Sequence, residues 1–461
     1  MNKEALRTSL VFLDSWLGYR SRQLDFPGFV VTICSKDSLV FSRAYGLADT
    51  ERTKPLTTGH RFSMASQSKM FTTTAVLQLV AQHKLRLDDM VCDYLPWLTK
   101  HRDTRFQEIS IRQLLSHSAG LIRDGREADF LRLSEPFPTD TALRKIILAS
   151  DLLFEPNTRP KYSNLGVALV GQVIAAASGQ TYAKYVHEHI IETLMLHNTT
   201  TDYAPPIDTH LVTGYGVPYD RYRPALRQRR KTLALMPAMG IHATTEDMCR
   251  FASAHFFGNE TILPDQLKRE MQRSAWSLRQ GYDSGTEAGL GLEVLHIGER
   301  RVVGHTGHLA GHASATFFDP YEQLVVAVAG NCKDMPVAQM IRGIFEALDW
   351  FALEQGKPTP KGLARFPVRL CGPTAIVEVV ASGQHLVVID PDDWEPFTWC
   401  EELEQVDANT LRITTPGSIQ SEGELICYTF HNSAVQSVRY GGITLTPETT
   451  YKHTLTRQQP N

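Results

Sequence analysis

Apolar and polar positions divide the chain into stretches with strand-like spacing and stretches with helical spacing. Residues 29–34 (FVVTIC) and 39–46 (LVFSRAYG) are β-rich runs joined by the polar segment SKDS, which predicts a β-hairpin. From about residue 70 to residue 256, most segments instead carry apolar residues at helical spacing. Strand-like runs return in LEVLHI, RRVVGHTG, ASATFFD and QLVVAVAG, and the amphipathic stretch IRGIFEALDWFALE follows them. The pattern predicts an α+β domain whose single sheet is interrupted in sequence by a large helical insertion.

A linker separates this region from a stretch with a different pattern. The segment QGKPTPKG, residues 355–362, combines two prolines and two glycines with polar residues. Beyond it, AIVEVVA, QHLVVID, TLRITT, LICYTF and AVQSVRY are short β-rich runs separated by turn residues. Such runs predict a small all-β sandwich or barrel. We therefore expect two domains, residues 1–355 and residues 363–455.

The sequence leaves the function of the second domain open. A lid over a cleft, an oligomer contact and a packed satellite domain are all compatible with its strands. The aromatic residues of DDWEPFTWC are predicted to fill the core of the barrel, because aromatic side chains bury large apolar areas. A recognition surface is the alternative. These residues are Trp394, Phe397 and Trp399.

Composition and charge narrow the classes of function. The 461 residues carry a formal net charge of -3, so no basic field for nucleic acid is expected. No stretch approaches about 18 uninterrupted apolar residues, so we expect no membrane-spanning helix. The N-terminal stretch MNKEALRTSLVFLDSWLGYRSRQ is typical of an amphipathic helix rather than of an export signal. Seven dispersed cysteines without a CxxC pair are typical of free thiols in a reducing cytoplasm.

The stretch RFSMASQSKMF places a hydroxyl and an amine three positions apart, at Ser66 and Lys69. On a helix this spacing sets both side chains on one face. A buried neutral lysine can then take the proton that makes a serine hydroxyl nucleophilic. A helix start also offers backbone N–H groups to a developing oxyanion. An ordinary helix start, with a capping serine and a solvated lysine, is the alternative that the spacing alone leaves open.

The tripeptide YSN, residues 162–164, follows the turn-forming EPNTRPK and precedes the apolar LGVALVGQVIAAASG. This position predicts a turn that opens a helix. There Tyr162 can pass a proton, and Asn164 can orient Lys69 or a substrate amide. The alternative is a tyrosine packed on the surface with Asn164 as the helix cap.

The segment VVGHTGHLAGHAS places His305, Thr306 and Gly307 at the end of an apolar strand. Gly307 allows a close approach of the backbone to a ligand, and the N–H of His308 can act as a second oxyanion donor. A metal site is not expected, because residues three apart on a strand point to opposite faces, which separates His305 from His308. No cofactor is expected either.

His117, in LLSHSAGL, invites a Ser–His triad interpretation. The chain contains no GxSxG nucleophile elbow, however. We predict a buried structural histidine.

In the order SxxK, YxN and HTG, these motifs resemble those of the serine β-lactamase and penicillin-binding-protein superfamily. The similarity is to the class C-like branch of esterases, D-aminopeptidases and carboxypeptidases, and it covers roughly residues 10–354. Further similar stretches are FPGFVVTICSKDSLVFSRAYGLAD, LRLDDMVCDYLP, IRQLLSHSAGL, PAMGIHATTEDMCRF and GLGLEV. The resemblance implies an antiparallel sheet flanked by helices, with a lipocalin-like barrel appended.

The resemblance also implies a role for each motif residue. Ser66 would be the acylated nucleophile, with Lys69 and Tyr162 as the proton-transfer pair. Asn164 would be the supporting amide. The main-chain N–H groups of Ser66 and His308 would form the oxyanion hole.

One departure from the family pattern changes the expected substrates. β-Lactamases and carboxypeptidases of this superfamily usually carry Lys-Thr-Gly where this chain has His305-Thr306-Gly307. Lysine offers a permanent cation to a substrate carboxylate, whereas histidine is largely neutral at pH 7. This disfavours penicillin hydrolysis and carboxypeptidase action. His305 is then expected to bind the substrate or to assist Tyr162, with Thr306 and Gly307 at the substrate site.

We therefore predict a cytoplasmic serine hydrolase that acts through an acyl-enzyme. Its substrate would be a small ester, an amide or a short peptide, including one with a D-residue. Two alternatives stay open: a penicillin-binding-like sensor or scaffold without turnover, and a true class C-type β-lactamase. The expected partner is this small molecule or peptide, without nucleic acid or membrane, and a homo-oligomer is compatible with the sequence.

Overall fold

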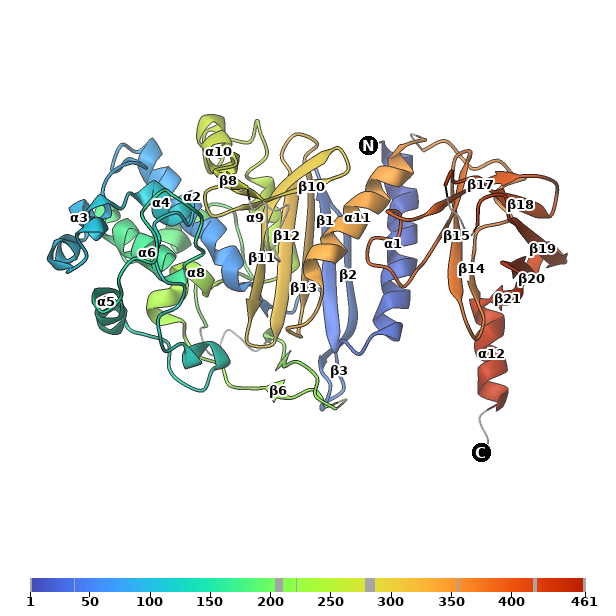
Figure 1. Ribbon diagram of the computed structural model, residues 1–461, viewed down its shortest axis with the longest axis horizontal. Coiled ribbons are helices and arrows are strands. Elements are labelled where there is room, and N and C mark those ends of the chain that lie inside the picture. The colour runs from blue at the N-terminus through green and yellow to red at the C-terminus, as the bar shows by residue number, and fades with distance from the viewer. Residues whose placement is uncertain are drawn as a thin grey trace. The chain divides into compact units, whose positions relative to one another are not determined.

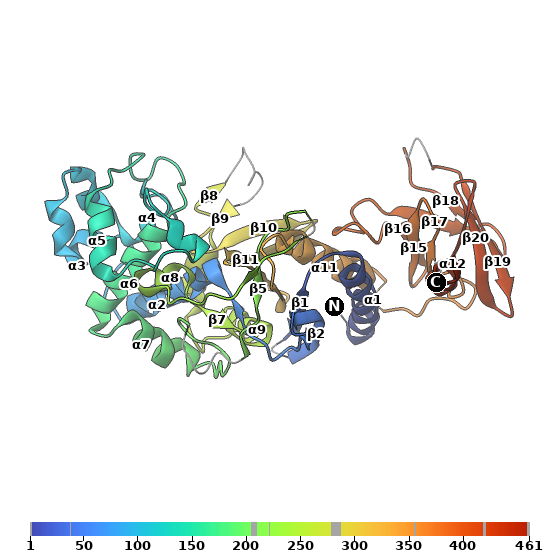
Figure 2. The same cartoon turned by 90° about the horizontal axis from the view of Figure 1, so that it is seen from below.

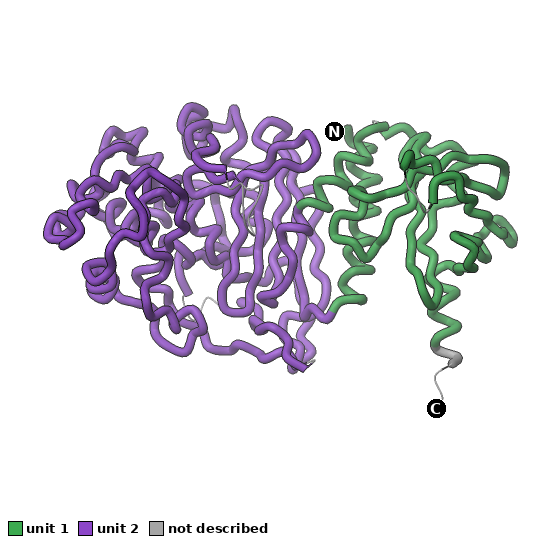
Figure 3. The backbone as a smooth tube through the Cα atoms, in the orientation of Figure 1, with its two compact units in different colours: residues 1–24, 342–461 green, residues 25–341 purple. Residues whose placement is uncertain are grey.

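The described residues fall into two units. The computed structural model describes residues 2–36, 38–203, 210–220, 222–277, 287–354, 356–417 and 421–458. One unit comprises residues 25–341, and the other comprises residues 1–24 together with residues 342–461 (Figure 3).

A nine-stranded antiparallel sheet organises the unit of residues 25–341, in the order β3-β2-β1-β13-β12-β11-β10-β9-β8 (Figure 1). The strand β1 lies between β2 and β13, so the N-terminal hairpin and the later strands share one sheet, as predicted. The centre of the sheet is almost wholly buried, which explains the continuous apolar run of β13. The strands are β1 (Gly28–Ser35), β2 (Ser38–Asp49), β3 (Lys54–Pro55), β8 (Trp276–Ser277), β9 (Glu287–Ala288), β10 (Glu293–Ile297), β11 (Arg300–Leu309), β12 (His312–Asp319) and β13 (Leu324–Gly330).

The helical insertion lies beside this sheet, and its helices α2 to α8 gather on one side in both views (Figures 1 and 2). The helix α2 is buried nearly all round, in keeping with its apolar sequence, and it packs against α6 and α8. Among the described helices, none combines the length and the apolar character needed to cross a bilayer. The helices are α2 (Ser68–Ala81), α3 (Val91–Tyr94), α4 (Ile111–Leu115), α5 (Asp140–Leu148), α6 (Asn164–Ser178), α7 (Tyr182–Val186), α8 (Met236–Met239), α9 (Thr245–Ser253) and α10 (Asp265–Gln272).

Shorter elements connect these helices and strands. Two small two-stranded sheets pair β4 with β7 and β5 with β6. Their bounds are β4 (Phe62–Ser63), β5 (Gly214–Tyr215), β6 (Ala225–Leu226) and β7 (His242–Ala243). Single turns of helix are η1 (Ala65–Gln67), η2 (Pro96–Lys100), η3 (Thr104–Glu108), η4 (Asp129–Arg132), η5 (His187–Ile191) and η7 (Leu233–Leu235).

The other unit contains a closed barrel of eight consecutive antiparallel strands, β14 to β21, which confirms the predicted barrel. Alternate residues of these strands, such as Leu411 and Leu445, form its apolar core together with Phe366, which precedes β14. The strands are β14 (Val368–Cys371), β15 (Ile376–Ser382), β16 (His385–Ile389), β17 (Glu401–Gln405), β18 (Thr410–Ile413), β19 (Leu425–His431), β20 (Ala434–Tyr440) and β21 (Ile443–Pro447). The remaining helices are α1 (Lys3–Gln23), α11 (Val337–Ala352), which runs across the unit boundary, and α12 (Glu448–Gln458).

The prediction that the aromatic residues between β16 and β17 fill the barrel was wrong. Trp394 packs edge-on against Trp16 of α1, with ring centroids 5.9 Å apart. Phe397 stacks on Trp350 of α11 at 4.9 Å. Trp399 is 83% exposed. The segment lies in a loop outside the barrel strands, where Trp394 and Phe397 pack against helices of the same unit and Trp399 does not.

Candidate active site

Ser66 lies in the single turn η1, directly before α2, rather than inside an α-helix. The residue before it, Ala65, has a left-handed backbone with φ 48°, which is unfavourable for a residue with a side chain. The side-chain amide of Gln67 donates a hydrogen bond from Nε2 to Ser314 Oγ of β12 at 2.7 Å. This bond fixes the position of the turn against the sheet. The sequence correctly predicted that Ser66 lies near a helix start, but it did not predict the single turn η1. In this turn the side chain of Ser66 is half-buried.

Gly307 explains how β11 approaches this turn so closely. A Cβ atom at position 307 would lie 2.1 Å from the carbonyl oxygen of Met64 and 2.8 Å from Ser314 Oγ. Only glycine fits there without moving the backbone. The close approach that the sequence predicted is therefore made to the chain's own turn, two residues before Ser66.

Tyr162 is the hydrogen-bond partner of Ser66. Its Oη lies 2.8 Å from Ser66 Oγ and donates to it. Burial raises the pKa of the Tyr162 phenol above its usual value. The ring packs against His117 at a centroid distance of 4.3 Å, and Lys69 Nζ lies 4.7 Å from the ring centroid. Tyr162 is therefore held in place on the nucleophile side of the site.

His117 packs against Tyr162 and does not contact the candidate nucleophile Ser66 in any hydrogen bond that the described residues form. Its Nδ1 accepts a hydrogen bond from the Ser163 N–H at 3.3 Å, and burial lowers the pKa of the imidazole well below its usual value. His117 thus supports Tyr162 by packing, while its Nε2 is buried without a hydrogen-bond partner among the described residues.

Lys69 is 1% exposed and donates hydrogen bonds to Asn164 Oδ1 at 2.8 Å and to the Ala238 carbonyl at 3.0 Å. Burial lowers the pKa of its ammonium group to about 7. A neutral amine has two N–H donors and one lone pair, whereas an ammonium has three donors. The neutral amine can make both hydrogen bonds, and it then keeps a lone pair that can accept a proton.

Asn164 does not cap the helix that it begins, so the capping alternative was wrong. The cap of α6 is Ser163, whose hydroxyl accepts from the Gly166 N–H at 2.9 Å. Asn164 Nδ2 instead donates to Asp124 Oδ1 at 2.7 Å. This bond fixes the orientation of the amide and directs its oxygen to Lys69.

Asp124 and Arg123 were not singled out from the sequence, although they follow LLSHSAGL directly in the polar stretch IRDG. The buried Asp124 carboxylate lies 3.1 Å from Arg123 Nε. Asp124 raises the pKa of Lys69 and Arg123 lowers it, although burial of Lys69 has the larger effect. The pair therefore adjusts the protonation of the candidate base from opposite directions.

On the sheet side, His305 is buried and contacts Glu293 of β10. His305 Nδ1 lies 2.5 Å from the Thr306 carbonyl oxygen and 3.2 Å from Glu293 Oε1. Burial lowers the pKa of His305 below its usual value, although Glu293 acts in the opposite direction. Glu293 also accepts a hydrogen bond from Thr306 Oγ1 at 2.8 Å. The sequence had not singled out this carboxylate, which belongs to the stretch GLGLEV.

His305 and His308 differ in exposure: His305 is buried and His308 is exposed. This agrees with the predicted opposite faces of the strand. Over the described parts of the chain, no group of three or more His, Cys, Asp or Glu side chains is placed to hold a metal ion.

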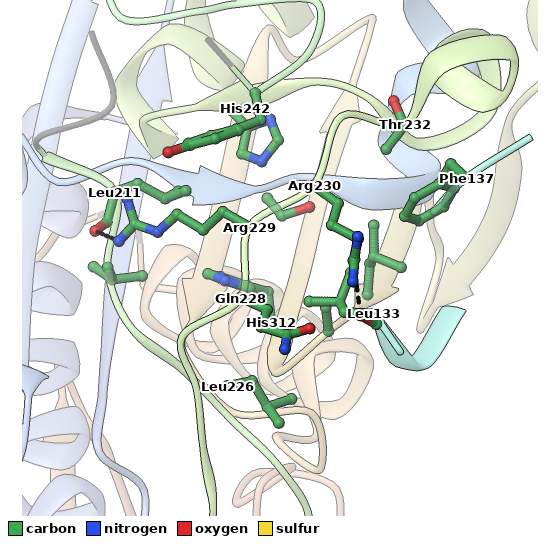
Figure 4. Close-up of a pocket in the computed structure, with 15 residues that line it drawn as sticks. Leu133, Phe137, Leu211, Leu226, Gln228, Arg229, Arg230, Thr232, His242 and His312 are labelled. Carbon is green, nitrogen blue, oxygen red and sulfur yellow. Dashed lines mark hydrogen bonds between the residues drawn. The ribbon is translucent and has the colours of Figure 1, made fainter. Parts of the chain in front are cut away.

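A small pocket of about 40 Å³ is lined by residues that include Arg229, Arg230 and His242 (Figure 4). Ser63, three residues before Ser66, and Leu309, which follows His308, also line it. At its edge, Arg229 donates to the Leu211 carbonyl at 2.8 Å and Arg230 to the Leu133 carbonyl, also at 2.8 Å. Such a volume holds a few water molecules or one small group.

His312 also lines this pocket (Figure 4). Burial lowers the pKa of its imidazole to about 3, so the ring is neutral at pH 7. The pocket therefore contains a neutral imidazole at the start of β12.

Comparison with known proteins places this geometry in a family. A family model described as Beta-lactamase matches residues 13–349. The chain is 21% identical to Protein flp of Staphylococcus aureus (strain MW2) over 329 residues, which are 71% of this chain and 64% of that protein. It is 30% identical to Beta-lactamase-like protein 4 of Dictyostelium discoideum over 323 residues, which are 64% of this chain and 55% of that protein. The chain thus spans less than two thirds of the length of these relatives.

Three solved structures share the fold. The octameric penicillin-binding protein homologue from Pyrococcus abyssi has a TM-score of 0.67 and 19% identity, covering 94% of this chain and 99% of its own. SurE has a TM-score of 0.60 and 20% identity, with 95% and 99% covered. A D-stereospecific amidohydrolase from Streptomyces sp. has a TM-score of 0.58 and 22% identity, with 72% and 94% covered. At these identities the likeness establishes the fold.

Proposed function

The chain belongs to the beta-lactamase family, and from this premise we propose that it is a serine hydrolase that forms an acyl-enzyme at Ser66. One observation carries the proposal: Tyr162 Oη contacts Ser66 Oγ at 2.8 Å beside Lys69, whose pKa burial lowers to about 7. A hydroxyl, a phenol and an amine that titrates near neutrality are the parts that serine acylation needs.

In the proposed reaction, the proton of the Ser66 hydroxyl passes to the Lys69–Tyr162 pair as Oγ attacks the substrate carbonyl carbon. Neutral Lys69 is the base of this pair, and Asn164 holds its amine in place. The carbonyl electron pair moves to oxygen, where the main-chain N–H groups of Ser66 and His308 stabilise the oxyanion. Tyr162 then gives a proton to the leaving group as its bond to the carbonyl carbon breaks. Water then attacks the acyl carbonyl carbon and gives a proton to the same pair. The bond from that carbon to Ser66 Oγ breaks, Oγ takes the proton back, and the acid product leaves.

The proposed substrates are small esters, amides and short peptides, including those with a D-residue. The neutral His305 supports this choice, because it replaces the cation that would bind a free carboxylate. Thr306 and His305 would contact the substrate, while Gly307 brings their strand against the nucleophile turn. Among the structural relatives, one is a D-stereospecific amidohydrolase and SurE has been solved with D-Leu.

Assembly and location are part of the same proposal. The octameric structural relative supports a homo-oligomer. The dispersed free cysteines support a reducing, cytoplasmic environment. We also propose the domain limits 1–355 and 363–455.

Turnover of p-nitrophenyl acetate tests the proposed function. The wild type should release a burst of p-nitrophenol followed by steady turnover, and Ser66→Ala should show neither. Ser134→Ala, which removes an exposed serine hydroxyl, should behave as the wild type. An acetyl adduct without turnover would favour the sensor or scaffold, and rapid hydrolysis of a chromogenic cephalosporin would favour the β-lactamase. Turnover that survives in Ser66→Ala would contradict the proposal.

A further inference from the structure

Glu293, His305 and Thr306, here called the acceptor wall, contact one another and each keep a hydrogen-bond acceptor that these contacts do not use. Thr306 shows this most simply. A hydroxyl has one proton, and that of Thr306 is donated to Glu293 Oε1 at 2.8 Å. Thr306 Oγ1 can therefore act toward a substrate only as a hydrogen-bond acceptor.

His305 is an acceptor for a related reason. Its Nδ1 faces two acceptors, the Thr306 carbonyl oxygen at 2.5 Å and Glu293 Oε1 at 3.2 Å, so Nδ1 carries the ring proton. In a neutral imidazole the other nitrogen, Nε2, then has a lone pair. A lysine at position 305 would instead present donors and a positive charge.

Glu293 gives the acceptor wall its negative charge. Its side chain is 25% exposed, and both of the contacts described above involve Oε1. Within the described residues, no lysine or arginine forms an ion pair with it. Its charge raises the pKa of both Lys69 and Tyr162, so it lies near the groups that flank Ser66. A substrate atom close to the reacting carbonyl is therefore within its field.

Lys69 and Arg123, whose charges both act on the nucleophile side of the site, already have partners. Lys69 is fully buried and donates to Asn164 and to the Ala238 carbonyl. The guanidinium of Arg123 lies 3.1 Å from the Asp124 carboxylate. The acceptor wall itself carries only the negative charge of Glu293, so a substrate cation placed on it would be attracted and a substrate carboxylate repelled.

We propose that the acceptor wall binds the α-ammonium group of the substrate, with Glu293 as its counter-charge. An α-ammonium group lies two bonds from the carbonyl carbon, which suits a carboxylate placed beside the reacting groups. The inference rests on the proposed serine hydrolase function and narrows its substrates to esters and amides of amino acids and to peptides with a free N-terminus.

Paired methyl esters test the inference, with rates followed in a pH-stat at pH 7. Methyl alaninate, as either enantiomer, carries the ammonium group, and methyl isobutyrate has a methyl group in its place. Monomethyl succinate carries a negative charge. The readout is the ratio of kcat/KM for methyl alaninate to that for methyl isobutyrate, in the wild type and in Glu293→Gln. Comparison of this ratio between variants cancels the different intrinsic reactivities of the two esters.

Glu293→Gln should lower this ratio about tenfold or more, because glutamine keeps an acceptor for Thr306 but has no charge. Glu299→Gln, which removes a carboxylate at the exposed turn of the same hairpin, should leave the ratio unchanged. A test on the wild type needs no variant: alaninamide should protect Ser66 from a fluorophosphonate and isobutyramide should not.

An unchanged ratio in Glu293→Gln would overturn the inference, as would a wild type that prefers monomethyl succinate. Failure to hydrolyse methyl alaninate while a fluorophosphonate still labels Ser66 would overturn it and leave the proposed function standing. Absence of labelling at Ser66 in the folded wild type would overturn the proposed function itself.

Discussion

Tyr162 and Ser66 are 96 residues apart in the sequence, and their hydroxyl oxygens are 2.8 Å apart in the structure. The phenol thus contacts the candidate nucleophile, while Lys69 bonds to Asn164 and to the Ala238 carbonyl. This arrangement assigns proton transfer at Ser66 to a pair of groups, in which the tyrosine contacts the serine and the lysine is the base.

Tyr162→Phe tests the contact directly. The variant keeps the ring that packs against His117 and removes only the hydroxyl. We expect kcat/KM for p-nitrophenyl acetate to fall about 10²- to 10⁴-fold, the range for loss of a positioned acid or base. The unfolding midpoint in urea should stay near that of the wild type. A fall of less than about threefold would contradict the role of Tyr162 in proton transfer.

The pH dependence of kcat/KM reports the protonation of Lys69. The lysine acts as a base only when it is neutral, so the activity of the wild type should rise with pH through about 7. Asp124 raises the pKa of Lys69 and Arg123 lowers it. Asp124→Asn should therefore move the rise to lower pH, and Arg123→Gln should move it to higher pH.

Two variants with opposite predicted shifts provide their own control. General damage to the site would lower the rates of both variants without moving their pH midpoints apart. Midpoints that shift in the same direction, or that coincide with that of the wild type, would show that Lys69 is not the titrating base.

Gly307→Ala tests the close approach of β11 to the nucleophile turn. The added Cβ would meet the Met64 carbonyl oxygen at 2.1 Å, and backbone atoms cannot move away cheaply. We expect a loss of about 1–3 kcal/mol in the free energy of unfolding, measured by urea denaturation, and slower labelling of Ser66. At Gly59 the nearest atom to an added Cβ is Thr57 Oγ1 at 3.9 Å, so Gly59→Ala should be tolerated. Equal effects of the two substitutions would contradict this packing.

The burial of Lys69 should appear in the pH dependence of stability. Its pKa is about 7 in the folded protein, against an ordinary value of 10.5. Between these values the unfolded chain binds the proton and the folded protein does not, so raising the pH stabilises the fold. The free energy of unfolding of the wild type relative to Lys69→Met should therefore rise between about pH 8 and pH 10, by at most about 1.4 kcal/mol per pH unit. A flat difference would show that Lys69 titrates normally.

Sequence patterns predicted the elements whose periodicity is local. The β-rich runs around SKDS form β1 and β2, and the later runs form β10 to β13 of the same antiparallel sheet. The short runs after the linker close into a barrel. Motif order also predicted that Ser66, Lys69, Tyr162 and Asn164 lie together, which the hydrogen bonds now show. The limits 1–355 and 363–455 stay predictions.

The parts that the sequence did not predict depend on contacts between distant residues. Asp124 orients the side chain of Asn164, which lies 40 residues further along the chain. The spacing of apolar residues within single helices or strands does not indicate contacts between residues so far apart. Glu293 of β10 accepts a hydrogen bond from Thr306 of β11. This contact depends on the register between the two strands, which the sequence pattern does not specify. Trp394 looked like a core residue, but apolar character alone does not tell which surface of a unit a side chain covers.

Intact mass after incubation with a fluorophosphonate probe tests the central claim most directly. The wild type should gain one adduct, located on Ser66 by peptide mapping. Ser66→Ala should stay unlabelled, and Lys69→Ala should react more slowly, because the base that activates the hydroxyl is gone. A folded wild type that gains no adduct, or an adduct that persists in Ser66→Ala, would contradict the assignment of Ser66 as the nucleophile.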